Sequence, residues 1–188
     1  MKKIYILLAQ SDTLISEVIR FVTRAPYNHA AIGVDDTLTY FWTFGRKLRF
    51  FPVIGGFIRE RINQGMYRHH PKTRCMISAL EVSDEEYEEV RATIRHYVKH
   101  RREYGYNHAA LFGGIIHRPF FQPKRHTCSE FVATVIQNCG IHRFARPLPL
   151  TRPDELMGIP GLEPIFEGLM MEFQPYGAQG NSFPAARA

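Results

Sequence analysis

Short apolar and alternating runs predict the strands of this chain. The first run is continuously apolar, which is typical of a buried strand. Two alternating runs flank Asp35-Asp36 and predict a hairpin. The predicted strands lie at residues 3–9, 30–34, 38–44, 75–82 and 164–173. They do not alternate regularly with helices, so the pattern favours an α+β domain with a largely antiparallel sheet.

Apolar residues at helical spacing predict three helices. Ser11 or Asp12 would cap the first, and Ser83 with Glu86 forms a capping box before the second. The third covers about residues 128–139 and is closed by a glycine. A short helical turn is also expected at residues 154–157.

The remaining segments are predicted to be irregular. The segment from Gly45 to Pro71 and the loop around Gly113-Gly114 contain glycine and proline. The tail, residues 174–188, is rich in Gly, Pro, Ala and Ser and is expected to be flexible. We therefore expect one domain over residues 1–173, with a basic flap at about 45–74.

Length and composition agree with an ordinary folded domain. The 188 residues are 45% hydrophobic and 22% charged, which allows a full core. Three cysteines at no framework spacing favour free thiols in a reducing compartment. The apolar run near the N-terminus is short and is followed by Gln10, Ser11 and Asp12, so we expect a cytoplasmic protein without a signal peptide or transmembrane segment.

The net charge of +6 is unevenly distributed. Residues 46–74 hold eight Lys or Arg and one Glu. Two interpretations stay open: a solvated loop, or a flap over a cleft that favours a ligand carrying carboxylate or phosphate. The segment has no nucleic-acid-binding motif, so a nucleic-acid partner is not expected.

The stretch HTCSEFVATVIQNCG contains the most informative cysteine. Thr127 and Glu130 fit a capping box, which places Cys128 in the first helical turn. The unpaired N–H groups and the dipole there favour a thiolate. Cys128 is therefore the candidate nucleophile, whereas Cys75 lies in a predicted strand and Cys139 at the opposite helix end.

Zinc is disfavoured, although His126 with Cys128 and Cys139 with His142 resemble two ligand pairs. The helix between the cysteines would hold them about 16 Å apart. Thiolates that share a zinc ion each lie about 2.3 Å from it.

The pentapeptide YNHAA occurs twice, with histidines at His29 and His108. His29 precedes a predicted strand in the hairpin, which can hold an imidazole rigidly. His108 lies in a turn flanked by glycine. A thiolate nucleophile requires a base, and this context favours His29.

The segments NHAAIGV, WTFG, YGYN and TCSEFVATVIQNCGI resemble the circularly permuted branch of the NlpC-type papain-like cysteine peptidases. This branch includes the lecithin retinol acyltransferase group. The resemblance covers roughly residues 3–173. It implies a permuted papain-like (NlpC-type) fold, a cysteine at a helix N-terminus and no cofactor.

By the same resemblance Cys128 corresponds to the nucleophile and His29 to the base. Thr43 is the best match for the third catalytic residue, and Asp36 is the second. The substrate site would include Tyr106, Tyr104 and Ser129.

The implied activity is hydrolysis of an amide or ester bond through an acyl-enzyme. The amide could be of peptide, isopeptide or γ-glutamyl type, so the expected partner is a small peptide, amide or lipid-like substrate. A lipid acyltransferase and an inactive binding module of the same fold remain alternatives.

Overall fold

A six-stranded sheet lies at the centre of the computed structural model, which describes residues 1–10, 26–46, 55–62, 64 and 67–175. In these residues every pairing in the sheet is antiparallel, in the order β4-β3-β2-β1-β5-β8. The strands are β1 (Lys2–Gln10), β2 (His29–Gly33), β3 (Tyr40–Arg46), β4 (Gly55–Arg61), β5 (Arg74–Val82) and β8 (Leu162–Leu169).

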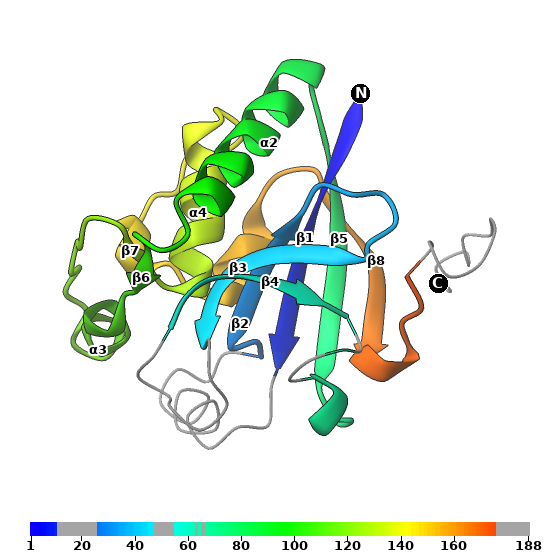
Figure 1. Ribbon diagram of the computed structural model, residues 1–188, viewed down its shortest axis with the longest axis horizontal. Helices are drawn as coiled ribbons and strands as arrows, with labels where there is room; N and C mark the ends of the chain where they lie inside the picture. The colour runs from blue at the N-terminus through cyan, green and yellow to red at the C-terminus, as the bar shows by residue number, and fades with distance from the viewer. Residues whose placement is uncertain (11–25, 47–54, 63, 65–66, 176–188) are drawn as a thin grey trace.

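The central strands are apolar because both faces of the sheet are covered. One face packs against α2 (Asp84–Lys99) and α4 (Cys128–Asn138), which lie on the same side of the sheet (Figure 1). Five residues of α4 are fully buried in that core: Phe131, Val132, Ala133, Val135 and Ile136. The other face forms a second core that includes Leu7, Phe41, Ile77 and Met170.

Smaller elements connect this framework. The two-residue strands β6 (Gly105–Tyr106) and β7 (Arg125–His126) pair in parallel, and α3 (His108–Ile116) lies between them in the chain. Short 3-10 helices are η1 (Tyr67–His69), η2 (Leu148–Leu150), η3 (Pro153–Gly158) and η4 (Met170–Glu172).

The predicted α+β class with a largely antiparallel sheet is confirmed, as are the hairpin and the helices after Ser83 and Thr127. Two predictions were wrong. β4 lies inside the segment expected to be irregular, and α3 lies where a loop was expected.

Several predictions lie outside the described residues. They concern the helix expected after Ser11 or Asp12, much of the basic flap and nearly all of the C-terminal tail. In the part of the chain that is described, none of the helices combines the length and apolarity needed to cross a membrane.

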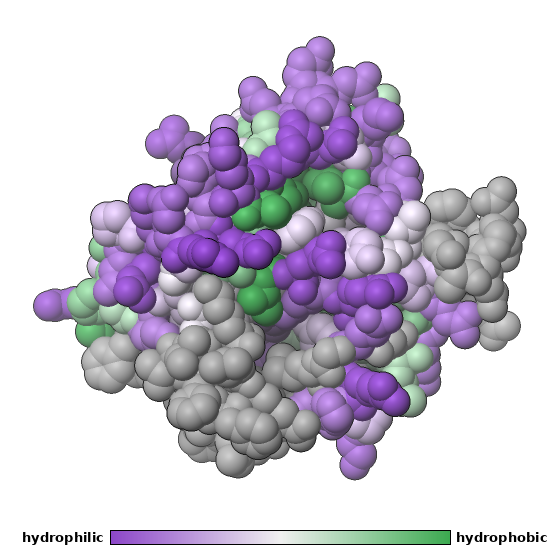
Figure 2. Space-filling model, viewed as in Figure 1, coloured by the Kyte–Doolittle hydropathy of each residue, from purple (hydrophilic) through white to green (hydrophobic). Residues whose placement is uncertain are grey.

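A groove between α2 and β3 has an apolar floor that contributes to the hydrophobic surface beside α2 in Figure 2. Its lining is Val34, Trp42, Ile94 and Val98, with Arg91, Arg95 and Lys99 at the edge. Val34 follows the last residue of β2, whereas His29 is the first residue of that strand. The groove therefore lies at the opposite end of β2 from His29.

Candidate active site

Cys128 is the first residue of α4, and Thr127 caps the helix. The Thr127 hydroxyl accepts a hydrogen bond from the Glu130 backbone N–H at 3.2 Å. Glu130 Oε2 accepts one from the Thr127 N–H at 3.0 Å. The predicted capping box is present, so Cys128 lies where free backbone N–H groups and the helix dipole stabilise an anion.

Three neighbouring groups stabilise the anionic form of the Cys128 sulfur: the backbone N–H groups of Ala30 and Ser129, and the His29 imidazole. Burial alone would raise the pKa of this thiol, whose residue is 7% exposed. The hydrogen bond and charge of His29 and the two N–H groups outweigh burial and lower the pKa below its ordinary value. The thiolate is therefore favoured.

His29 lies between Cys128 and Glu60. Its Nε2 is 3.0 Å from Glu60 Oε2, and the two side chains are only 16% and 10% exposed. Burial lowers the pKa of His29, but the charge of Glu60 and the hydrogen bonds with Cys128 and Glu60 raise it well above the ordinary value. Since Glu60 occupies Nε2, Nδ1 is the nitrogen left for the thiol. The arrangement favours a thiolate–imidazolium pair.

Glu60, in β4, is a site residue that the sequence analysis missed. Tyr67, in η1, donates a hydrogen bond to the same Oε2 at 3.0 Å. Burial and the charge of Glu60 raise the pKa of Tyr67 well above its usual value, so its hydroxyl stays protonated. The available signal was that Glu60 is the single acidic residue in the basic segment 46–74.

Thr43 was predicted as the imidazole partner, but the side chain that contacts His29 Nε2 is Glu60. The buried Thr43 hydroxyl donates to the Ala30 carbonyl at 2.6 Å. Asp36 is also engaged elsewhere, since its Oδ1 accepts a hydrogen bond from Tyr5 at 2.9 Å. Thr43 instead fixes the backbone beside His29, at the residue whose N–H contacts the sulfur.

The three residues predicted to bind substrate, Tyr106, Tyr104 and Ser129, lie in different structural environments. Tyr106 lies in β6 and pairs with His126, two residues before Cys128. Tyr104 packs against Tyr97 at 4.5 Å between ring centroids and bonds His96 through its hydroxyl. The Ser129 hydroxyl donates to the Thr151 carbonyl at 2.6 Å, so its backbone N–H, not its side chain, faces the sulfur.

The two YNHAA copies have different structural roles. The first places His29 at the start of β2, beside Cys128. In the second, Asn107 is the N-cap of α3 and accepts a hydrogen bond from the Ala110 N–H at 3.1 Å. His108 is the first residue of that helix.

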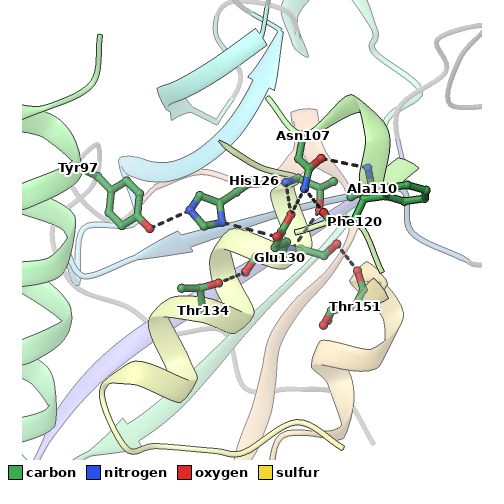
Figure 3. A network of polar contacts seen from close by, with 10 residues as sticks. Tyr97, Asn107, Ala110, Phe120, His126, Glu130, Thr134 and Thr151 are labelled. Carbon is green, nitrogen blue, oxygen red and sulfur yellow. Dashed lines mark hydrogen bonds and ion pairs between the residues drawn. The ribbon is translucent and has the colours of Figure 1, made fainter. Parts of the chain in front are cut away.

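A buried polar network lies at the start of α4 (Figure 3). Glu130 accepts hydrogen bonds from Asn107 and Thr127, and its Oε1 lies 3.9 Å from His126 Nδ1. Burial lowers the pKa of His126 to about 4 and raises that of Glu130 to about 6. His126 is therefore neutral at pH 7, and its hydrogen bond is with the Tyr97 hydroxyl at 3.1 Å.

Cys128 and Cys139 lie at opposite ends of α4. α4 is unbroken from Cys128 to Asn138, so it separates the two pairs that resemble zinc ligands. Among the residues that the structure describes, no three His, Cys, Asp or Glu side chains are grouped as ligands.

Comparison with known proteins gives the fold but no family. No family model matches the chain, and no curated protein matches it. The chain is similar to the crystal structure of metalloprotein yiiX from Escherichia coli O157:H7, DUF1105, with a TM-score of 0.61 and 18% sequence identity. The match covers 89% of this chain and 98% of that chain. At this identity the likeness concerns the fold alone.

Proposed function

We propose that this protein is a cysteine hydrolase that cleaves an amide or ester bond through an acyl-enzyme on Cys128. The observation that carries the proposal is the chain of contacts from the Cys128 sulfur through His29 to Glu60. A nucleophile, a base and a group that orients the base are the three parts that such catalysis needs.

The reaction begins with attack of the Cys128 thiolate on the substrate carbonyl carbon. As the tetrahedral intermediate collapses, the His29 imidazolium donates its proton to the leaving amine or alcohol, and a thioester remains on Cys128. His29 then takes a proton from water, which attacks the thioester and releases the acid and the thiolate.

The start of α4 would supply an oxyanion site. The backbone N–H of Cys128, at the first helical position, has no carbonyl partner within the helix. A fixed N–H at a helix start is suited to the negative oxygen of the intermediate. The Tyr106 hydroxyl is a second candidate donor, because β6 lies beside the segment that leads into Cys128.

The order of elements supports assignment to the permuted NlpC-type papain-like branch. The histidine opens a strand early in the chain, and the cysteine opens a later helix that packs on that strand. The structural neighbour is described as a metalloprotein. Among the described residues of this chain, no three His, Cys, Asp or Glu side chains are grouped so that they could hold a metal ion.

The substrate class remains a small peptide, isopeptide, γ-glutamyl or lipid-like acyl compound. A lipid acyltransferase would share the acyl-enzyme and use another acceptor in place of water. A non-catalytic binding module would fit a weak imidazole partner such as threonine. The Glu60 carboxylate on His29 favours a catalytic site instead. Three unpaired thiols suit a reducing compartment such as the cytoplasm.

Acyl-enzyme formation tests the proposal. The protein is mixed with p-nitrophenyl acetate, and its intact mass is followed together with nitrophenol release. We expect one acetyl group on Cys128, none in Cys128→Ala, and a rate about 10² to 10⁴ lower in His29→Ala. His108→Ala is the matched histidine control and should retain most of the rate. Acetylation that persists in a folded Cys128→Ala variant would refute the proposal.

A further inference from the structure

The last residue of α3 and the loop after it expose a set of large apolar side chains. Ile116, Phe120 and Phe121 are 44%, 39% and 69% exposed. They are three of the six exposed large hydrophobic residues in the described part of the chain, and they lie within six positions of each other. Clustered exposed aromatic residues mark an interaction surface, unlike scattered ones.

Cationic residues flank these side chains in the sequence. Arg118 lies between the isoleucine and the phenylalanines, and Lys124 and Arg125 follow them. Arg101 and Arg102 lie in the turn that leads to Gly105, whose N–H bonds the Lys124 carbonyl. Glu103 is the single acid here and pairs with Lys124. Hydrophobic surface next to hydrophilic side chains is visible at the α3 end of the molecule (Figure 2).

The backbone of this loop is anchored. The Arg118 N–H bonds the Gly113 carbonyl at 3.0 Å. A Cβ at Gly113 would lie 2.3 Å from the Arg118 carbonyl oxygen, so only glycine permits this close return. Asn107 Nδ2 donates to the Phe120 carbonyl at 3.0 Å (Figure 3). The phenylalanines are therefore displayed by a fixed loop.

We infer that Ile116, Arg118, Phe120, Phe121, Lys124 and Arg125 form a docking tip for an anionic lipid bilayer. The aromatic rings would enter the headgroup and acyl boundary while the cations contact acidic headgroups. Charge complementarity favours this partner, because the tip has three cations against a single neighbouring acid, Glu103, which pairs with Lys124. α3 has nine residues, so the tip would lie on the membrane and not span it.

The same anchor connects the tip to the candidate active site. Asn107 bonds both Phe120 and Glu130, and Glu130 is two residues from Cys128. A bilayer at the tip would hold the start of α4 in a constant orientation toward the lipid surface. Docking itself does not depend on the chemistry of Cys128.

Vesicle sedimentation tests docking without any catalytic readout. The Cys128→Ala protein is sedimented with vesicles of phosphatidylcholine alone or with 30% phosphatidylserine added, at about 0.1 M and 0.5 M NaCl. We expect binding to the anionic vesicles that weakens at high salt. Arg118→Gln should reduce partitioning about fivefold, and Phe120→Ser with Phe121→Ser at least about tenfold.

Matched controls lie elsewhere on the surface. Met171 is 57% exposed, and Arg143 is exposed, so Met171→Ser and Arg143→Gln should bind as well as the parent. No binding, equal binding to both vesicle types, or tip variants that match these controls would overturn the inference. Light scattering could instead show a dimer that is lost only in the tip variants, with no vesicle binding. That result would also overturn the inference and would assign this surface to contact with a second copy of the chain.

Discussion

At Glu60 a single carboxylate oxygen accepts hydrogen bonds from both His29 and Tyr67. This arrangement fixes the imidazole and supplies the charge that favours its protonated form. The contact joins residues 31 positions apart. Local pattern does not reveal such a contact, which is why the sequence favoured a threonine on the nearer strand.

Glu60→Gln should make the thiolate form of Cys128 less favourable. Removing the negative charge lowers the pKa of His29, and the loss of the imidazolium raises the pKa of Cys128. The pH profile of Cys128 alkylation should therefore move to higher pH, and turnover should fall by up to about 10⁴. Asp36→Asn is the control. An unchanged profile in folded Glu60→Gln would exclude the orienting role.

Thr43→Val should lower the free energy of unfolding without changing the pKa of the Cys128 thiol. It leaves the buried Ala30 carbonyl without its hydroxyl donor, which costs about 1–3 kcal/mol of unfolding free energy. Chemical denaturation measures that loss, and alkylation measures the thiol. A pH profile for Cys128 displaced as far as in Glu60→Gln would instead restore Thr43 as a direct partner of His29.

At the scale of elements, α2 and α4 were predictable because each begins with a complete capping box followed by apolar residues at helical spacing. β4 and α3 were not. The edge strand β4 is rich in glycine and charge, and its pairing with β3 determines its conformation. α3 contains two glycines that predict a turn in isolation.

The two capping boxes offer a matched experiment. Thr127→Ala and Ser83→Ala should each cost about 1 kcal/mol of unfolding free energy. Only Thr127→Ala should slow Cys128 alkylation near neutral pH, because it loosens the N–H groups that stabilise the thiolate. If both variants leave the thiol unchanged, the helix start contributes nothing to its activation.

At the scale of the whole molecule, His126 and Glu130 have opposite effects on how the free energy of unfolding changes as pH falls. The lowered pKa of His126 gives stability that is present above pH 6.5 and is lost as pH falls toward about 4, up to about 3 kcal/mol. The raised pKa of Glu130 gives stability that is present below pH 4.5 and is lost as pH rises through about 6, up to about 2 kcal/mol.

Single variants should separate the two effects. Relative to the wild type, His126→Gln should lose less unfolding free energy between pH 6.5 and 4, and Glu130→Gln should lose more. Urea unfolding at closely spaced pH values measures both slopes. Equal slopes in all three proteins would mean that neither group titrates differently in the folded and unfolded states.

The central claim is that Cys128 is a thiolate because His29 is its imidazolium partner. The most direct measurement is the alkylation rate of each cysteine by iodoacetamide against pH, read by peptide mass spectrometry. Cys128 should react fastest, and at a pH below the ordinary range of thiols. Cys75 and Cys139 should stay unreactive, because burial raises the pKa of Cys75 to about 12 and also raises the pKa of Cys139. In His29→Ala the Cys128 profile should move to much higher pH. A Cys128 profile that is the same in folded His29→Ala as in the wild type would contradict the claim.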